Sequence, residues 1–222
     1  MQTVIFDLDG TLADTSGDLI AAANATFEHM GLGPLLDPQA DKLTAFHGAR
    51  AMLRLGFSRI EGGGEDDVEA GYPFLLDHYA ANINNLTVLY PGARDTVEAL
   101  LGQGYKVGIC TNKPVEMADD LMRRLDMRDL FAGFVGAGTL SVSKPDPAPY
   151  RLAVEQSGGA VEQSLIVGDT ATDAKTARAV GVPAVLVGFG PEGDEVGRHG
   201  ADAVIPDFPA LPDTVARLIG RP

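Results

Sequence analysis

Short apolar runs alternate with amphipathic helical stretches along most of the chain. The runs that we expect to form strands are residues 3–8, 105–111, 164–169, 184–187 and 203–205. They are continuous rather than alternating with polar residues, which is typical of parallel strands covered on both faces. Two helical stripes between them consist of Ala93, Val97, Leu100 and Leu101, and of Val115, Ala118, Leu121 and Leu125. This alternation predicts an α/β fold with a doubly wound, Rossmann-like parallel sheet.

Residues 15–89 break the alternation. Thr15 and Asp18 match a T-x-x-D capping box that would begin a helix. Two apolar stripes at helical spacing follow, Leu19, Ala23, Phe27 and Met30, then Tyr72, Leu76, Tyr79 and Ile83. We expect a flexible acidic connection at residues 62–67 between them and no strand. Residues 15–89 are therefore predicted to be an all-helical domain inserted after the first strand of a core made of residues 1–14 and 90–222.

Composition narrows the classes of partner. Of the 222 residues, 31 are Asp or Glu and 17 are Lys or Arg, so the formal net charge is −14. Such a chain repels nucleic acid and anionic membranes, because binding to both begins with neutralisation of phosphate groups. Cys110 is the single cysteine, which excludes an intrachain disulfide and fits a reducing compartment. We also see neither a signal peptide nor an apolar run of about 20 residues, and so expect a cytoplasmic protein.

The segment VIFDLDGTLADT, residues 4–15, carries the clearest chemical signal. It ends an apolar strand with Asp7 and Asp9, followed by Gly10. Two neighbouring carboxylates raise the pKa of one member unless a cation intervenes, so they suit either an acid beside a nucleophile or a divalent metal site. Gly10 would let backbone N–H groups approach an oxyanion. Taken alone, the segment fits an ordinary turn as well; an EF-hand loop is excluded because Leu12 occupies the position of its glycine.

Polar residues also follow the other strands of the predicted sheet. Thr111 and Asn112 end the second core strand, Lys144 precedes Pro145 in SKPDP, and Asp169 and Asp173 follow the strand at residues 164–169. Individually these residues fit a polar turn, a solvated lysine and a helix N-cap. Together they predict a phosphate site, because the carboxylates suit Mg²⁺ and Lys144 offsets their repulsion of a phosphoryl group.

The same segments resemble a known family. FDLDGT, the Thr111–Asn112 strand end, SKPDP and VGDTATD resemble, in this order, the four motifs of the haloacid-dehalogenase-like hydrolase superfamily. The resemblance covers nearly the whole chain. The helical insertion is similar to the cap of the branch that contains phosphoglycolate phosphatase and β-phosphoglucomutase. Thr170 stands where many members have serine.

The resemblance implies a role for each motif residue. Asp7 would be the nucleophile that becomes an aspartyl-phosphate, and Asp9 would protonate the leaving oxygen and then activate water. Thr111, Asn112 and Lys144 would hold the phosphoryl oxygens. Mg²⁺ would be bound by Asp7, the backbone carbonyl of Asp9, and Asp169, with Asp173 behind them. In the cap, Arg50 would pair with a substrate carboxylate, although a solvated helix arginine explains it equally well.

We therefore expect an Mg²⁺-dependent phosphomonoester hydrolase that acts on a small phosphorylated metabolite, with 2-phosphoglycolate as the leading candidate. One alternative is a β-phosphoglucomutase-like sugar-phosphate mutase. Another, from a different class, is a non-catalytic switch phosphorylated on Asp7. The G-x-G-x-x-G match at residues 188–193 is expected to be a loop, because Pro191 and nearby acids disfavour a pyrophosphate site.

Overall fold

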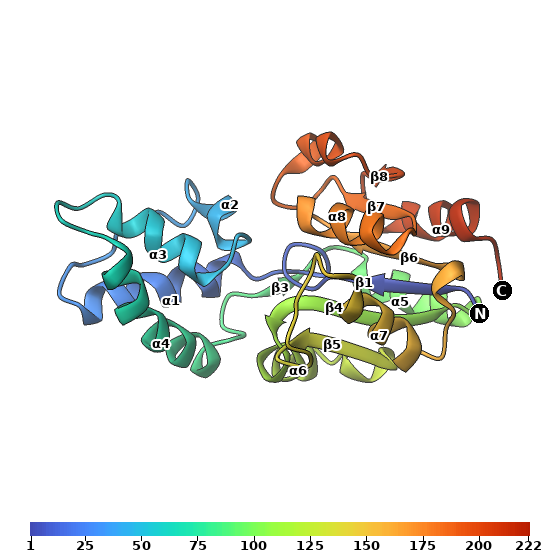
Figure 1. Cartoon of the computed structure of the whole chain (residues 1–222), viewed down its shortest axis with the longest axis horizontal. Helices are drawn as coiled ribbons and strands as arrows, with labels where there is room; N and C mark the ends of the chain where they lie inside the picture. The colour runs from blue at the N-terminus through green and yellow to red at the C-terminus, as the bar shows by residue number, and fades with distance from the viewer. The chain divides into compact units, whose positions relative to one another are not determined.

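The computed structural model describes all 222 residues, which form two compact units (Figure 1). The first unit combines Met1–Ala13 with Leu89–Pro222, and the second is the continuous segment Asp14–Val88. We call them the core unit and the helical unit. No helix in the structure is long and apolar enough to cross a membrane.

The core unit is built on a six-stranded parallel sheet in the order β5-β4-β1-β6-β7-β8. The strands are β1 (Thr3–Phe6), β4 (Lys106–Pro114), β5 (Gly133–Ala137), β6 (Ser164–Gly168), β7 (Ala184–Val187) and β8 (Ala203–Ile205). β1 lies in the middle, where Thr3 is in register with Lys106 on one side and with Ser164 on the other. The predicted α/β fold is thus confirmed.

Helices cover both faces of this sheet. They are α5 (Ala93–Gly102), α6 (Val115–Arg124), α7 (Pro147–Gln156), α8 (Ala171–Val180) and α9 (Leu211–Ile219). α7 and α8 pack against each other and on neighbouring strands, and α5 and α9 form a second such pair. Figure 1 shows α7 in front of the sheet and α5 behind it. Ile5, Ile166 and Tyr150 are fully buried in one cluster of the core. All four residues of β1 are buried, as expected of a parallel strand that is covered on both faces.

Several strand boundaries differ from the prediction. β1 ends at Phe6 rather than at residue 8, and β4 continues to Pro114 rather than ending at residue 111. β5 was not predicted at all, because its sequence, GFVGA, has a glycine at two of five positions and too few β-branched residues to stand out. Glycine is required here: a Cβ on Gly133 would lie 2.2 Å from the carbonyl oxygen of Ala153 in α7.

The helical unit consists of α1 (Ser16–His29), α2 (Lys42–Ala45), α3 (Ala49–Phe57) and α4 (Glu65–Ala81). α4 packs against α1 and α3. Phe27 and Phe57 meet edge to face in the interior, with ring centroids 5.2 Å apart. Short strands β2 (Ala13–Asp14) and β3 (Val88–Leu89) form a separate two-stranded sheet, which the prediction of helices alone missed.

Two local predictions in this unit were wrong. Thr15 and Asp18 form no capping box: the Thr15 side chain makes no cap hydrogen bond. Asp18 instead accepts hydrogen bonds from the backbone N–H groups of Leu86 and Thr87 and from the Thr87 hydroxyl. A tertiary contact has replaced the local one. The acidic segment at residues 62–67 is only partly a connecting loop, because α4 begins at Glu65. The acidic residues of its first turn interact favourably with the helix dipole.

The apolar face of α4 also differs from the predicted stripe. The buried residues are Val68, Gly71, Leu75 and Tyr79, whereas Tyr72 and Leu76 are half-buried. Gly71 faces α1, since a Cβ there would lie 2.9 Å from the Thr26 methyl group. The face that α4 buries is therefore set by the close approach of α1 at Gly71. The spacing of large apolar residues could not predict this face, because the residue at the contact is a glycine.

Candidate phosphoryl-transfer site

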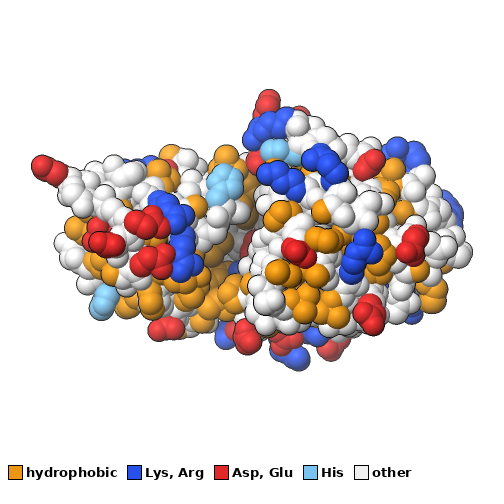
Figure 2. Space-filling model, viewed as in Figure 1, with side chains coloured by type: hydrophobic (Ala, Val, Ile, Leu, Met, Phe, Trp, Pro, Cys, Tyr) orange, Lys and Arg blue, Asp and Glu red, His pale blue; other side chains and the backbone are white.

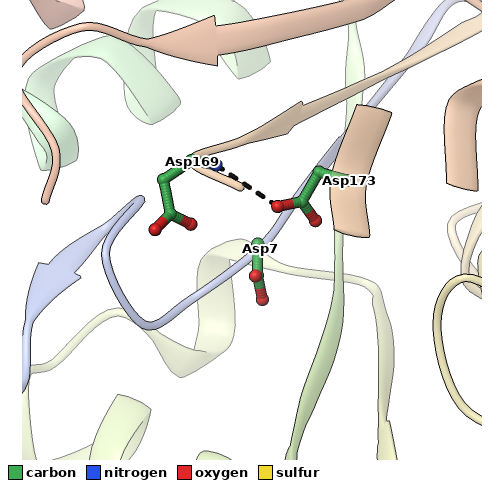
Figure 3. A group of neighbouring side chains, drawn as sticks. All are labelled: Asp7, Asp169 and Asp173. Atoms are coloured by element: carbon green, nitrogen blue, oxygen red, sulfur yellow. Dashed lines mark hydrogen bonds between the residues drawn. The ribbon is translucent and has the colours of Figure 1, made fainter. Parts of the chain in front are cut away.

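Three carboxylates converge at one edge of the core sheet (Figure 3). Asp7 directly follows β1, Asp169 directly follows β6, and Asp173 lies in the first turn of α8. One oxygen of each lies within 4.8 Å of the others. β1 and β6 are parallel neighbours, so their carboxyl ends bring Asp7 and Asp169 to the same edge, which is where α/β sheets bind ligands.

The turn after β1 is closed by its own backbone. The N–H groups of Thr11, Leu12 and Ala13 all point at the carbonyl oxygen of Leu8. Gly10 has a φ of 81°, which favours glycine, and its N–H donates to the carbonyl of Ala13. The turn therefore already uses the N–H of Gly10, and the expectation that other backbone N–H groups approach an oxyanion here stays a prediction.

Lys144 lies between two of the carboxylates. Its Nζ is 2.7 Å from Asp173 Oδ1 and 3.1 Å from Asp7 Oδ2, and its side chain is only 1% exposed. Burial lowers the pKa of the Lys144 ammonium, but Asp173 and Asp7 outweigh burial and hold that pKa above its usual range. The ammonium therefore stays charged, as a buried cation with two anionic partners should.

The pKa of Asp7 is raised to about 6. Burial is the main cause; the Lys144 ammonium lowers the pKa, while the charge of Asp173 raises it again. Because Asp7 titrates below neutrality, it is mainly a carboxylate at neutral pH, the form that a nucleophile needs. One of its oxygens also accepts the backbone N–H of Leu8, at 2.7 Å, which fixes the orientation of the carboxylate.

Asp169 has one oxygen with a partner and one without. The Thr11 hydroxyl donates to Oδ1 at 2.9 Å, but Oδ2 is buried and accepts no hydrogen bond. Burial, followed by the charges of Asp173 and Asp7, raises the pKa of Asp169 well above its usual value. A buried oxygen without a partner is costly in a protein interior. A divalent cation bound to it would supply the missing interaction, so the residues present fit a hard metal ion.

Asp173 is fixed by the start of α8. Its Oδ2 accepts from the backbone N–H groups of Asp169 and Thr170 and from the Thr170 hydroxyl. Thr170 is the N-cap of α8, and Asp173 completes its capping box. The N-cap therefore lies one residue after Asp169, the position that the sequence suggested for it. There is no spare room beside this carboxylate, because a Cβ on Gly168 would lie 2.2 Å from Asp173 Cγ.

Thr111 and Asn112 lie at an irregular part of β4, where its register with β5 shifts between Cys110 and Pro114. The Thr111 hydroxyl accepts the backbone N–H of Lys113. The side-chain amide of Asn112 makes two hydrogen bonds with the backbone of Lys144. Cys110 is fully buried and burial raises the pKa of its thiol to about 12, so it is an inert part of the core.

Asp9 is not part of the cluster of three carboxylates. Its two oxygens lie 3.0 and 3.3 Å from Nζ of Lys113, a residue for which the sequence suggested no role. The Lys113 side chain is 3% exposed. The one sign of this role in the sequence is that Lys113 follows the Thr111–Asn112 pair near the end of an apolar strand. A lysine at a strand end is usually solvated, so this sign was too weak to predict a buried ion pair.

Arg50 lies in the helical unit, at the start of α3. Its Nε and Nη2 bind the two oxygens of Glu69 in α4 at 2.7 and 3.0 Å, and its guanidinium stacks 3.6 Å from the centre of the Tyr72 ring. Arg54 and Glu65 pair in the same way one turn along. Figure 2 shows acidic and basic side chains side by side on the visible face of this unit. Arg50 is thus already paired with a carboxylate, and its predicted contact with substrate remains a prediction.

The loop after β7 lies beside Asp169 and the turn after β1. A Cβ on Gly190 would lie 3.0 Å from the carbonyl oxygen of Gly10 and 3.4 Å from Cβ of Asp169. The residues that follow form a 3-10 helix, Gly193–His199, rather than an α-helix. The prediction that this glycine motif is a loop is confirmed. Its proximity to Asp169 was not predicted, because nothing in the sequence links the two segments.

Comparison with known proteins agrees with this geometry. Residues 4–187 match the sequence model of the haloacid dehalogenase-like hydrolase family. The chain is 38% identical to the phosphoglycolate phosphatase of Rhodospirillum rubrum, over 96% of this chain and 90% of that one. It is 34% identical to that of Agrobacterium fabrum, over 98% and 94%. A predicted phosphoglycolate phosphatase from Haemophilus somnus has a similar crystal structure, with a TM-score of 0.84 and 25% identity over 96% of this chain and 97% of that one.

Proposed function

Because the chain belongs to the haloacid dehalogenase-like hydrolase family and is a phosphatase of that family, we propose that it hydrolyses 2-phosphoglycolate with the help of Mg²⁺. The names of the relatives support this substrate. The observation that carries the proposal is the position of Lys144, 3.1 Å from Asp7 and 2.7 Å from Asp173. A buried cation beside an ionised carboxylate lets an anionic phosphoryl group approach a nucleophile that would otherwise repel it.

The reaction that we propose has two displacements at phosphorus. A carboxylate oxygen of Asp7 attacks the phosphorus of the substrate while the bond from phosphorus to the glycolate oxygen breaks. Asp9 donates its proton to that oxygen, so glycolate leaves as an alcohol. A water molecule then attacks the phosphorus of the aspartyl-phosphate, and Asp9 takes a proton from this water. Inorganic phosphate leaves, and Asp7 is again a carboxylate.

The remaining residues position the phosphoryl group. Lys144 and the polar groups of Thr111 and Asn112 are proposed to contact its oxygens. The side chain of Asn112 already binds the backbone of Lys144, so its contact with the phosphoryl group is proposed on the resemblance alone. Asp173 keeps the Lys144 ammonium at the edge of the sheet through their 2.7 Å ion pair.

Mg²⁺ is proposed to bind Asp7, Asp169 and the backbone carbonyl of Asp9, with Asp173 behind them. The unpartnered Oδ2 of Asp169 supports this assignment, as does the convergence of the three carboxylates. When bound, Mg²⁺ supplies positive charge that offsets the repulsion between these carboxylates and the phosphoryl oxygens.

The core unit and the helical unit are proposed to have different roles in the reaction. The core unit carries the reacting groups, and the helical unit acts as a cap that keeps bulk water from the aspartyl-phosphate. We further propose that the enzyme works in the cytoplasm on a small phosphorylated metabolite. A single cysteine, buried and free, and a net charge of −14 support this setting.

The test is phosphate release from a panel of small phosphomonoesters by the wild type and Asp7→Asn, each with and without Mg²⁺. Asp7→Asn keeps the shape of the side chain and removes the nucleophilic carboxylate. We expect 2-phosphoglycolate to be the best substrate, with turnover that requires both Mg²⁺ and Asp7. A better substrate elsewhere in the panel would replace 2-phosphoglycolate, and turnover by Asp7→Asn would exclude the proposed nucleophile.

The same assay separates the alternatives. A sugar-phosphate mutase would interconvert glucose phosphates without releasing phosphate, which phosphorus NMR of the products detects. A phosphorylated switch would form a lasting phosphoryl-enzyme, and Asp9→Asn would leave the rate of its breakdown unchanged. For a phosphatase, Asp9→Asn should slow both formation and breakdown of that intermediate.

A further inference from the structure

Thr11 connects the turn after β1 to Asp169, which directly follows β6. Its side chain is fully buried, and its hydroxyl donates to Asp169 Oδ1 at 2.9 Å. The two residues are 158 positions apart in the chain, and the sequence suggested no role for Thr11 beyond its place in FDLDGT. The hydrogen bond therefore joins two strand ends at the carboxylate that is proposed to bind Mg²⁺.

The turn that carries Thr11 is held by its own backbone. The N–H groups of Thr11, Leu12 and Ala13 lie 3.3, 3.0 and 3.2 Å from the carbonyl oxygen of Leu8. Threonine is also β-branched, which restricts rotation about its first side-chain bond. The hydroxyl of Thr11 therefore has a defined position at this edge of the sheet.

Asp169 is fixed on its other sides as well. Its backbone N–H donates to Asp173 Oδ2 at 3.3 Å. The loop after β7 lies against its side chain, since a Cβ on Gly190 would lie 3.4 Å from Cβ of Asp169. The last torsion of an aspartate side chain is broad and has no strong preference of its own. The hydrogen bond from Thr11 therefore sets the plane of this carboxylate.

The two oxygens of Asp169 consequently have different surroundings. Oδ1 accepts the Thr11 hydroxyl, whereas Oδ2 is buried and accepts no hydrogen bond. Figure 3 shows one oxygen of Asp169 on the side of Asp7 and Asp173 and the other on the opposite side. Mg²⁺ requires a nearly ideal octahedron, whereas Ca²⁺ accepts more ligands, a flexible geometry and both oxygens of one carboxylate. A carboxylate that offers one oxygen therefore suits Mg²⁺.

Resting on the proposed function, we propose that Thr11 is a positioning residue that makes Asp169 bind the metal through one oxygen and so favours Mg²⁺ over Ca²⁺. Thr11→Val keeps the shape of the side chain and removes the hydroxyl, so Asp169 can turn and offer both oxygens. If Thr11 only joined the two strand ends, its loss would weaken the binding of both ions by the same factor. The informative quantity is therefore the ratio of the dissociation constant for Ca²⁺ to that for Mg²⁺.

Calorimetry on the metal-free protein measures this ratio for the wild type, Thr11→Val, Thr11→Ser and the matched control Thr26→Val. Thr26 is also fully buried, and its hydroxyl donates to the Ala22 carbonyl within α1 at 2.8 Å. We expect Thr11→Val to weaken Mg²⁺ binding about 10- to 100-fold, as loss of a hydrogen bond to a metal ligand does, and Ca²⁺ binding at most about three-fold. Thr11→Ser, which keeps the hydroxyl, and Thr26→Val should keep the ratio within about two-fold. An unchanged ratio in Thr11→Val would overturn the proposal.

Infrared spectroscopy of the wild type provides a second readout that needs no variant at Thr11. Spectra with and without each ion, compared with those of Asp169→Asn, isolate the two stretching bands of the Asp169 carboxylate. Binding through one oxygen moves these bands apart, and binding through both oxygens moves them together. We expect wide separation with Mg²⁺, and a narrow one would contradict the proposal. Failure of the proposed function is distinct, because the wild type would then release no phosphate from 2-phosphoglycolate with or without Mg²⁺.

Discussion

The side-chain amide of Asn112 binds the backbone of Lys144 on both sides. Its Oδ1 accepts the Lys144 N–H at 2.9 Å, and its Nδ2 donates to the Lys144 carbonyl at 2.9 Å. The two residues are 32 positions apart in the chain. The segment that carries Lys144 is therefore attached to the end of β4, and the direction of its ammonium depends on Asn112.

Replacing Asn112 by alanine removes both hydrogen bonds and leaves the Lys144 backbone without these partners. We expect the free energy of unfolding to fall by about 1–3 kcal/mol and kcat to fall at least about ten-fold, because Lys144 is no longer held between Asp7 and Asp173. Urea denaturation and phosphate release measure the two effects. Asn85→Ala, at an exposed position, is the control and should change neither. Full activity in Asn112→Ala would show that Lys144 is positioned without it.

Replacing Asp169 by asparagine separates metal binding from folding. Without divalent cations, the variant should be at least as stable as the wild type, because one of three repelling carboxylates is gone. With Mg²⁺, the wild type should gain about 2.7 kcal/mol at a concentration 100 times the dissociation constant, and the variant should gain almost nothing. Thermal unfolding with and without Mg²⁺ measures the difference. An equal Mg²⁺ effect in both proteins would place the metal elsewhere.

The pH dependence of stability should report on Asp7. Its pKa is about 6 in the folded chain and 3.8 for an ordinary aspartate, so the folded state holds its proton more tightly. Between these values the folded state binds more protons than the unfolded state, and stability falls as pH rises.

We therefore expect the stability of the wild type relative to Asp7→Asn to fall by up to about 3 kcal/mol from pH 4 to pH 7 without divalent cations. Chemical denaturation of both proteins across this range gives the difference directly. Added Mg²⁺ should reduce the fall, because a bound cation stabilises the carboxylate. A difference that rises with pH would contradict the assignment of a raised pKa to Asp7.

A methyl group on Gly168 should displace Asp173. Because the added Cβ would lie 2.2 Å from Asp173 Cγ, Gly168→Ala should destabilise the protein by roughly 1–3 kcal/mol, as overpacking of a core does, and lower kcat by disturbing the ion pair with Lys144. The matched control is Gly102→Ala at the end of α5, where nothing lies within 4 Å of the added atom. It should stabilise the protein by up to about 1 kcal/mol. Equal effects of the two variants would exclude a steric cause.

The order of strands and helices was visible in the sequence because it rests on local chemistry. Buried parallel strands need continuous apolar runs, and residues 184–187 and 203–205 are strands at those bounds. β5 was not predicted because it contains glycines. At least Gly133 is needed for the close approach of α7, and α7 is another part of the chain. Asp18 was misread for the same reason, since its partners Leu86 and Thr87 are far along the chain.

The candidate site shows the same limit. Asp7 and Asp169 follow strands that local patterns revealed, so their meeting at one sheet edge follows from the parallel fold. The partners of Asn112 and Asp9 did not follow, because a sequence does not show which way a side chain turns at the irregular end of β4. The resemblance placed Asn112 on the phosphoryl oxygens, whereas its side chain binds the Lys144 backbone.

The central position of β1 has a consequence for the order in which the chain folds during synthesis. β1 leaves the ribosome before its two neighbours, β4 and β6, so Thr3 can pair only after Lys106 and Ser164 have been synthesised. Asp14–Val88 is a compact unit that is continuous in the chain, so its internal contacts can form once residue 88 has emerged. We expect this segment to become compact while β1 is still unpaired, because contacts between distant residues form slowly. β1 would then be among the last strands of the sheet to pair.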